Sequence, residues 1–390
     1  MSFQGSIAQE NVNFPIESII EPLAGEQYSR AMVYIPISQA AEYLSGYDNP
    51  QTGALIELNS SNYGTITSGD LKSQLVPFFT KAQAASVGIA IYNDAQPEPP
   101  AEPEEGQDPV EPEVITNTLS DVYQATKYYA YFKFGLANSD AFNALQVELA
   151  QLCAADTLYS ALWIGISDTN VLTKTSALVS QLNEQTGLRY RLIYNPDTTI
   201  NAALAQLGVT LSSANQTGTP VGNDVDFKAF NTIGASGSLD ADGNRQNLSA
   251  TDKATLDEQK IGYVTWVGDG TSNVVVEGSL YNNGDSVGAE WIKAYITYMC
   301  KIKTANFITQ GGKFRNNSTY QAILTILRSV VNGFLQFGRL ANFVVSAPPF
   351  SDLPKTGDTI VINNAWKADY IDQVRSVTVY GTLYIQQPSK

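Results

Sequence analysis

The sequence contains no histidine, and this absence excludes several kinds of site. A chain without histidine has no Ser-His or Cys-His nucleophile pair, lacks the commonest general base, and cannot build most zinc sites. An enzyme made from this chain would have to work with carboxylates, lysine, tyrosine or a cofactor alone. We predict no catalytic residue, no metal site, no cofactor and no enzymatic activity.

Cysteine is also scarce, with Cys153 and Cys300 as the two examples. They lie in the apolar, helix-like segments "LAQLCAAD" and "YITYMCKI". Two cysteines in such surroundings predict buried free thiols, and a disulfide or a metal site is the weaker alternative.

Long apolar runs are missing as well. No run approaches the roughly 18 residues that a membrane-spanning helix needs. The opening "MSFQGSIAQENVNFP" has neither the basic region nor the apolar region of a secretory signal, so we expect neither secretion nor membrane insertion. The formal net charge of −15 argues against binding to nucleic acid or to an anionic membrane surface.

Charge is distributed unevenly along the chain. The last hundred residues hold eleven Lys and Arg against four Asp, which is a net charge of +7 and leaves −22 on the first 290 residues. Between Trp291 and Ser351 there is no acidic residue. Such a dipolar molecule is suited to contact with other copies of itself or with an acidic protein.

A proline-rich acidic segment runs from Asp94 to Glu113. It contains eight carboxylates, six prolines and no basic residue. Such a composition repels itself and has little to bury, which predicts a solvated linker or surface loop. A partner-binding tail is the alternative.

Strands and helices alternate from Lys127 onward, and this alternation predicts an α/β fold with a parallel-type sheet, flanking helices and right-handed crossovers. Earlier segments fit the same architecture. The expected strands cover residues 29–38, 86–93, 127–134, 158–167 and 188–194, and the expected helices cover 68–85, 139–156, 174–187 and a segment that opens behind Asp197 or Thr198.

The C-terminal part predicts a different organisation, after a loop-rich stretch at 209–260. We expect a β-hairpin over 262–278 with its turn at 268–270. Two amphipathic helices should follow, and the last fifty residues read as mixed β-structure. The expected helices cover residues 289–306 and 319–337.

The segment from Ser376 to Ile385 alternates between two faces in β-branched and aromatic residues, as a β-strand does. One face carries Val377, Val379, Leu383 and Ile385, and the other carries Thr378, Tyr380, Thr382 and Tyr384. Residues 1–20 read as an extended arm. The terminal strand could be an ordinary edge strand of its own molecule, or it could pair with the sheet of another.

Two polar strand ends offer a candidate ligand site. Asp168 and Asp197 each follow a predicted parallel strand, and in α/β sheets ligands bind beyond the carboxyl ends of the strands. The pair could hold Mg²⁺ or act as acid and base in an enzyme or small-ligand-binding module. The simpler interpretation is that both side chains cap turns. The segment beginning at Asp240 does not complete a calcium loop, because Arg245 stands where glycine is required.

Read in order, these segments resemble the tail sheath proteins of contractile bacteriophage tails. An N-terminal arm leads into "SRAMVYIPIS", and "LVPFFTKAQAASVGIAIYN" resembles the family's helix followed by a strand. The run "KIGYVTWVGDGTSNVVVEGSLYNNGDSVGAEWIKAYITYMC" resembles its strand, glycine-rich turn and Trp-containing helix. The helix "YQAILTILRSVVNGFLQFGRLANF" and the ending "YIDQVRSVTVYGTLYI" resemble its late helix and terminal strand. The acidic insert is not part of the shared pattern.

The resemblance implies a structural subunit of the virion tail that is assembled in the host cytoplasm. Subunits of this family stack as hexameric rings around a tail tube, exchange strands through their terminal arms, and contract to drive the tube through the host envelope. The implied partners are further copies of the chain, the tail tube protein, and the baseplate and tail terminator proteins. No nucleotide is consumed.

The resemblance also divides the chain into parts. These are an N-terminal arm (1–20), a first part of the core (21–93), the insert (94–117), an α/β middle region (118–285), a C-terminal core (286–375) and a terminal strand (376–390).

Two sets of residues become candidate interaction sites. The strand-exchange hypothesis rests on Val377, Val379, Tyr380, Leu383 and Ile385. The second hypothesis is that the basic segment faces the tail tube, against the alternative that it neutralises the molecule's own acidic part. The residues in question are Lys301, Lys303, Lys313, Arg315, Arg328 and Arg339.

Overall fold

The computed structural model describes most of the chain between Arg30 and Tyr370, and the structural statements below concern only these residues. The terminal strand, the N-terminal arm and nearly all of the acidic insert lie outside them. The described residues are 30–47, 50–66, 70–82, 85–95, 115–127, 129–135, 142–156, 160–214, 233–243, 245–267, 272–276, 281–284, 287–310, 316–336, 340–345, 347–353 and 366–370.

An eight-stranded sheet forms the centre of the larger part of the molecule, which we call the body (residues 30–284). Its strand order is β2-β3-β1-β4-β5-β6-β7-β8. All inner pairings are parallel, and only the two outermost pairings are antiparallel. This confirms the predicted α/β fold class. The strands are β1 (Arg30–Pro36), β2 (Leu55–Asn59), β3 (Ser86–Tyr92), β4 (Phe132–Gly135), β5 (Ala161–Ile166), β6 (Tyr190–Tyr194), β7 (Ile261–Val267) and β8 (Ser272–Val276).

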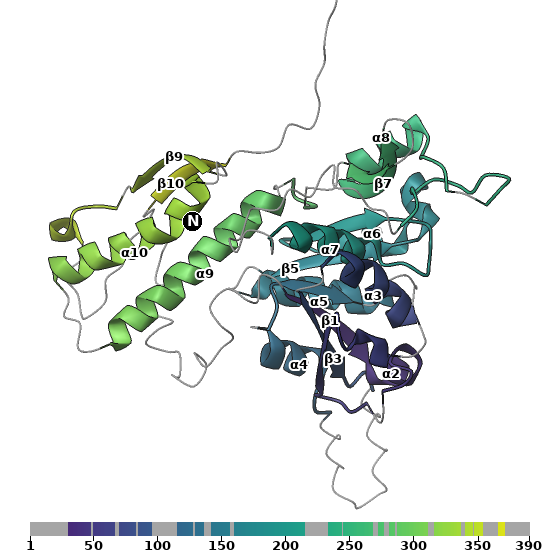
Figure 1. Ribbon diagram of the computed structural model, residues 1–390, viewed down its shortest axis with the longest axis horizontal. Coiled ribbons are helices and arrows are strands. Elements are labelled where there is room, and N and C mark those ends of the chain that lie inside the picture. Colours follow the sequence, from purple (N-terminus) through teal and green to yellow (C-terminus); the bar gives the residue numbers. More distant parts are fainter. Residues whose placement is uncertain are drawn as a thin grey trace, which may run out of the picture.

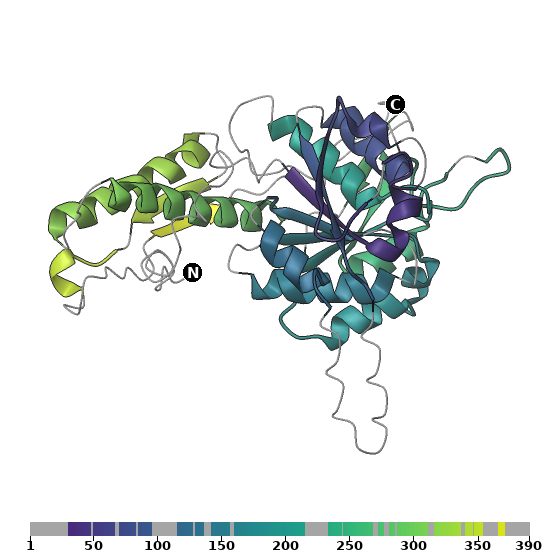
Figure 2. The same cartoon turned by 90° about the horizontal axis from the view of Figure 1, so that it is seen from below.

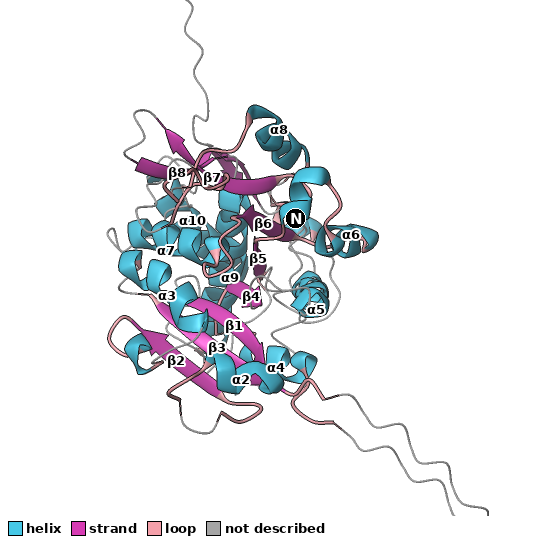
Figure 3. Cartoon of the chain, turned by 90° about the vertical axis from the view of Figure 1, so that its right-hand side faces the viewer, coloured by secondary structure: helices cyan, strands magenta, loops and turns pink. Residues whose placement is uncertain are grey.

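Helices cover both faces of this sheet (Figure 1). In Figure 3, α3 and α7 lie on one side of the strands, and α5 and α6 lie on the other. The helices of the body are α2 (Ile37–Tyr43), α3 (Asp70–Lys81), α4 (Leu119–Thr126), α5 (Asn143–Ala155), α6 (Ala177–Glu184), α7 (Ala202–Ala214) and α8 (Ala250–Glu258), with short 3₁₀ turns η3 (Tyr63–Thr65) and η5 (Thr169–Thr173).

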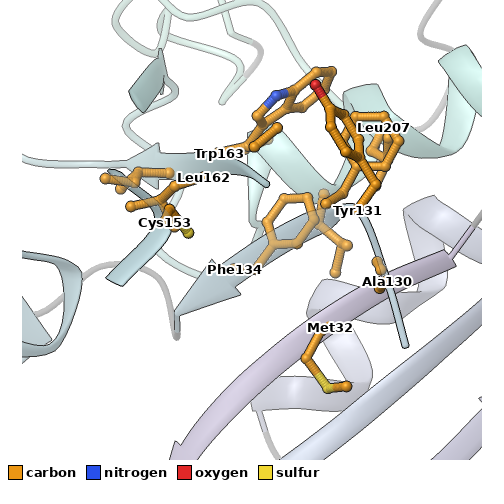
Figure 4. Close-up of a cluster of buried hydrophobic side chains, with 14 of the residues drawn as sticks. Met32, Ala130, Tyr131, Phe134, Cys153, Leu162, Trp163 and Leu207 are labelled. Carbon is orange, nitrogen blue, oxygen red and sulfur yellow. The ribbon is translucent and has the colours of Figure 1, made fainter. Parts of the chain in front are cut away.

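The core is densest around the middle strands, where both faces are covered and every residue of β5 is buried. Trp163 is fully buried there, and its ring meets the ring of Phe132 edge-on with the centroids 5.3 Å apart. Figure 4 shows Trp163 beside Tyr131 and Leu207, so the layer joins β5 to the β4 region and to α7. Burying strands on both faces explains why their sequences are continuously apolar rather than alternating.

Most predicted boundaries shift by a few residues, and three differences are larger. The strand expected over 127–134 begins only at Phe132, because Lys127 ends α4 and the chain then turns. The helix expected behind Asp197 begins at Ala202 instead, where the side chain of Asn201 caps it by accepting a hydrogen bond from the Leu204 amide at 3.1 Å. Residues 209–260 are not loop throughout.

Within 209–260, helix α7 continues to Ala214, and α8 occupies Ala250–Glu258. The α8 helix is capped by Ser249, whose side chain accepts a hydrogen bond from the Asp252 amide at 3.1 Å. A Ser-x-x-Asp sequence is a start signal that predicts a helix, so this element could have been recognised.

The described residues after the body form a smaller part, which we call the lobe (described residues between 287 and 370). Figure 2 shows it extending from the body along the long axis of the molecule. The hairpin before it pairs β7 with β8 in antiparallel register, as predicted. The lobe consists of α9 (Val287–Thr309), α10 (Asn317–Gln336), β9 (Leu340–Val345), η6 (Phe350–Asp352) and β10 (Trp366–Tyr370), and the two helices confirm the predicted pair.

Candidate functional site

The two aspartates of the candidate ligand site are both used as turn caps. A carboxylate oxygen of Asp168 accepts a hydrogen bond from the amide of Asn170 at 2.9 Å. One carboxylate oxygen of Asp197 accepts from the amide of Thr199 at 3.0 Å and from its hydroxyl at 2.7 Å. Such bonds are the ordinary use of aspartate after a strand.

The space beyond the carboxyl ends of β6 and β7 is filled by the chain itself. Ser236 is buried there; its hydroxyl donates to the Tyr194 carbonyl at 2.8 Å and accepts from the Val264 amide at 2.9 Å. Asn195, also buried, donates through its side chain to the carbonyl of Gly234 at 3.1 Å. The loop containing Ser236 therefore packs on the end of β6 and on the backbone of β7.

Titration behaviour around these strand ends reflects burial. Desolvation raises the pKa of Tyr194 to about 12; the charge of Arg245 opposes this shift, and the smaller effects of Asp252 and Asp168 add to it. Within the described part of the chain, no cluster of three or more Cys, Asp or Glu side chains is arranged to hold a metal ion. In the described residues, Asp168 and Asp197 are therefore observed as turn caps.

The two cysteines are buried free thiols, as predicted. Burial raises the pKa of Cys153 and of Cys300 to about 12 in each case. A thiol is a nucleophile only as the thiolate, so neither side chain is activated for chemistry at neutral pH.

The lobe is held together by an aromatic cluster between its helices. The rings of Trp291 and Tyr295 stack with centroids 5.5 Å apart, and Phe334 of α10 meets Tyr295 edge-on at 5.6 Å. These side chains fix α10 against α9 and leave other faces of both helices exposed. No helix in the described ranges is long and apolar enough to cross a lipid bilayer.

A small antiparallel sheet packs against α10. Within the described residues it contains only β9 and β10, and Val344 on β9 is 57% exposed. A two-stranded sheet is marginally stable unless a further strand or a packed helix supports it. Among the described strands, β10 is the nearest in sequence to the predicted terminal strand.

The predicted strand-exchange residues Val377, Val379, Tyr380, Leu383 and Ile385 lie outside the described residues. Of the six predicted basic residues, Lys303 on α9 and Arg328 on α10 have exposed side chains. Lys301 lies on α9, but its side chain is outside the described set, as are Lys313, Arg315 and Arg339 entirely. The two described cations thus stand on the exposed surface of the lobe.

Comparison with solved structures finds a similarity of fold. The chain resembles a chain in a structure described as "Cryo-EM structure of the anti-feeding prophage (AFP) baseplate, 6-fold symmetrised", with a TM-score of 0.62 and 11% sequence identity. The similarity covers 92% of this chain and 94% of that chain. No family model matches the sequence, and no curated protein matches it. The shared feature is the fold, over nearly the whole length of both chains.

Proposed function

We propose that this protein is a structural subunit of a contractile tail or injection machine, of the sheath type. In this proposal copies of the chain stack as hexameric rings around a tail tube and shorten to drive the tube through a cell envelope. The protein belongs to the assembled tail, is put together in the host cytoplasm, and contacts the tube, baseplate and tail terminator proteins. It performs no catalysis.

The observation that carries the proposal is the similarity of fold over 92% of this chain and 94% of a chain in a baseplate of the anti-feeding prophage. Doubly wound α/β bodies are common and support many functions. A match that extends through the body and into the lobe is more specific than a match to the sheet alone. The sequence resemblance to tail sheath proteins points in the same direction.

The lobe supports a strand-exchange step within this proposal. Its small sheet, with β9 and β10, gains stability from every strand added to it. We expect the strand from Val377 to Ile385, together with an arm from residues 1–20 of another copy, to complete β-structure between neighbouring subunits. Residues Val379, Tyr380 and Leu383 would then lie in the inter-subunit sheet.

The basic residues of the lobe support contact with an acidic tube surface. Lys303 and Arg328 are exposed and stand in a stretch of chain with no acidic residue. Opposite charges on two facing surfaces speed association and fix orientation. We expect Lys301, Lys313, Arg315 and Arg339 to contribute to the same surface.

Electron microscopy of the purified protein tests the proposal. Full-length protein should form rings or rods, and removal of residues 1–20 or 376–390 should abolish them while a folded monomer remains. Circular dichroism and sedimentation confirm folding of each truncated form. Normal polymers from the truncated proteins would show that the termini do not join the subunits.

Charge reversal tests the tube contact separately. Lys303→Glu combined with Arg328→Glu should reduce co-sedimentation with tubes at low salt. Lys81→Glu combined with Lys174→Glu is the matched control, since it makes the same change of net charge on the body. Equal binding by both variants at every salt concentration would count against a tube-facing lobe.

A further inference from the structure

A β-hairpin projects from the body, and we call its described residues, 237–243 and 245–246, the tongue. Leu239 and Arg245 form an antiparallel bridge, and the amide of Gln246 donates to the carbonyl of Ser238 at 2.9 Å. At its base the amide of Gly237 donates to the Gln246 carbonyl at 2.8 Å. Gly243 closes the turn with a φ of +81°, a conformation that favours glycine.

The tongue combines an exposed apolar side chain with an exposed carboxylate. Leu239 is 55% exposed, although it stands on a hairpin whose backbone is hydrogen-bonded. Asp242 is exposed three residues further on, and its amide donates to the Asp240 carboxylate at 3.0 Å. Covering such a side chain with an apolar surface of another molecule would remove its apolar area from water, which is favourable.

The outer face of the lobe's small sheet offers a matching surface. Val344 is 57% exposed, and in the β9–β10 register it stands directly opposite Lys367, which is also exposed. The neighbouring carboxylate of Asp369 accepts a hydrogen bond from the side chain of Asn342 at 2.7 Å. Val344 and Lys367 on this sheet complement Leu239 and Asp242 on the tongue, because an apolar side chain would face an apolar one and an ammonium would face a carboxylate.

The two surfaces lie at opposite ends of the molecule. Figure 1 shows the lobe at one end of the long axis and the tongue, the loop at the far right, at the other, and Figure 2 shows the same separation from below. A chain therefore cannot bring its own tongue to its own lobe. The only copy of this surface that the tongue can reach belongs to another molecule.

We infer that the tongue of one copy docks on the outer face of the β9–β10 sheet of a second copy, with Leu239 against Val344 and Asp242 facing Lys367. This contact is head-to-tail, so repeating it generates a ring or a helical array rather than a closed pair. The inference rests on the proposed self-assembly, and it names a contact that the terminal arms do not supply.

Disulfide trapping tests the contact directly. We expect the variants Leu239→Cys and Val344→Cys, when mixed and oxidised, to give a covalent dimer that neither variant gives alone. The native Cys153 and Cys300 are 4% and 1% exposed, so they do not compete for the oxidant. A chain carrying both substitutions should give a ladder of covalent oligomers.

Charge exchange provides a second test that does not depend on cysteine. Asp242→Lys and Lys367→Glu should each weaken self-association by about tenfold, measured by sedimentation at low salt, and the combination should restore it. Glu184→Lys, which reverses an exposed carboxylate of the body outside the tongue, is the matched control and should have no such effect.

The outcomes separate this inference from the proposed function. If rings or rods form in the microscope but no mixed dimer is trapped and charge exchange gives no rescue, the tongue contact is wrong and the proposed function stands. Mixed dimers without rings or rods would support the contact and oppose the sheath assignment. A full-length protein that never self-associates would overturn both.

Discussion

Arg189 and Glu290 are separated by 101 residues, and a guanidinium nitrogen of the first lies 2.7 Å from a carboxylate oxygen of the second. Arg189 stands just before β6 in the body, whereas Glu290 lies in the first turn of α9. Their side chains are only 15% and 11% exposed. The carboxylate also pairs with Lys293 at 3.0 Å. This pair joins the body to the root of the lobe's long helix.

Removing one member of this pair should be costly. Glu290→Ala leaves the guanidinium of Arg189 largely buried without its partner carboxylate, so we expect a loss of roughly 3 kcal/mol in the free energy of unfolding. Glu258→Ala is the control, because it breaks the exposed Lys174–Glu258 pair and should cost well under 1 kcal/mol. Urea denaturation measures both. Equal losses of unfolding free energy in the two variants would show that the buried pair contributes no more to stability than the exposed pair.

Two helical glycines should respond to alanine in opposite directions. A Cβ on Gly208 of α7 would lie 2.7 Å from the carbonyl oxygen of Phe78 in α3, whereas a Cβ on Gly333 of α10 meets nothing within 4 Å. Gly208→Ala should therefore destabilise the protein by roughly 2 kcal/mol through overpacking. Gly333→Ala should stabilise it by about 1 kcal/mol through helix propensity. Thermal unfolding of both variants distinguishes the two effects by sign.

The α/β body was predictable because its strands and helices have strong, repeated patterns. The six residues of β5 are all buried and all apolar or glycine, so the segment reads as an inner strand of a parallel sheet. Helix α4 was missed although Thr118 and Asp121 form a capping box, a signal present in the sequence. Strand β2 was missed because five residues at a sheet edge alternate too briefly to be distinguished from loop.

Other features depend on contacts between distant segments and could not be predicted. Arginine is mostly exposed in proteins, yet Arg191 is buried, with its guanidinium 4.3 Å from the Trp163 ring centroid and hydrogen-bonded to Gln206. The candidate site at Asp168 and Asp197 was reasonable from topology. Only the structure shows that the loop containing Ser236 fills the neighbouring strand ends.

Lys133 gives the protein a specific response to alkaline pH. The side chain is fully buried; its ammonium donates to the carbonyl of Lys127 at 2.9 Å and lies 5.5 Å from the Tyr123 ring centroid. Burial lowers its pKa to about 8, and the charges of Cys153 and Asp156 oppose that shift. The unfolded chain therefore binds more protons than the folded chain between about pH 8 and pH 10.5, and the Lys133 contribution to stability rises with pH in that window.

Lys133→Met isolates this effect. The difference in free energy of unfolding between wild type and variant should move in favour of the wild type by roughly 2 kcal/mol from pH 7.5 to pH 10. Above pH 9, buried thiols and tyrosines such as Cys300 and Tyr190, whose pKa values are raised to about 12, lower the stability of the folded protein as pH rises. Because these groups are present in both proteins, taking the difference between wild type and variant removes most of their effect. A difference that stays constant with pH would mean that Lys133 keeps an ordinary pKa.

Binding of Mg²⁺ tests whether Asp168 and Asp197 form a ligand site or only cap turns. Because Asp168 and Asp197 serve as turn caps, we expect millimolar Mg²⁺ to leave the melting temperature unchanged. The variant Asp168→Asn/Asp197→Asn keeps capping oxygens at both positions and should fold normally. A melting temperature that rises with Mg²⁺ in the wild type but not in this variant would instead favour the ligand-binding module.

At the β2 edge of the main sheet, one side chain occupies two backbone groups. The amide group of Asn62 donates to the carbonyl of Glu57 at 3.0 Å and accepts from the amide of Asn59 at 2.6 Å. These are the two backbone groups of β2 that a residue on an added parallel strand would use. An exposed edge strand is a template for pairing with other chains, so Asn62 limits unwanted association through β2.

Asn62→Ala should therefore release this edge. At high protein concentration, we expect sedimentation and light scattering to show a larger amount of irregular aggregate than in the wild type. The amount of ordered polymer should fall accordingly. Ser61→Ala is the control, since Ser61 enters this turn through its backbone amide, which donates to the Asn59 side chain at 2.9 Å. If the Asn62 variant aggregates no more than the Ser61 variant at equal concentration, the side chain of Asn62 does not restrict self-association through β2.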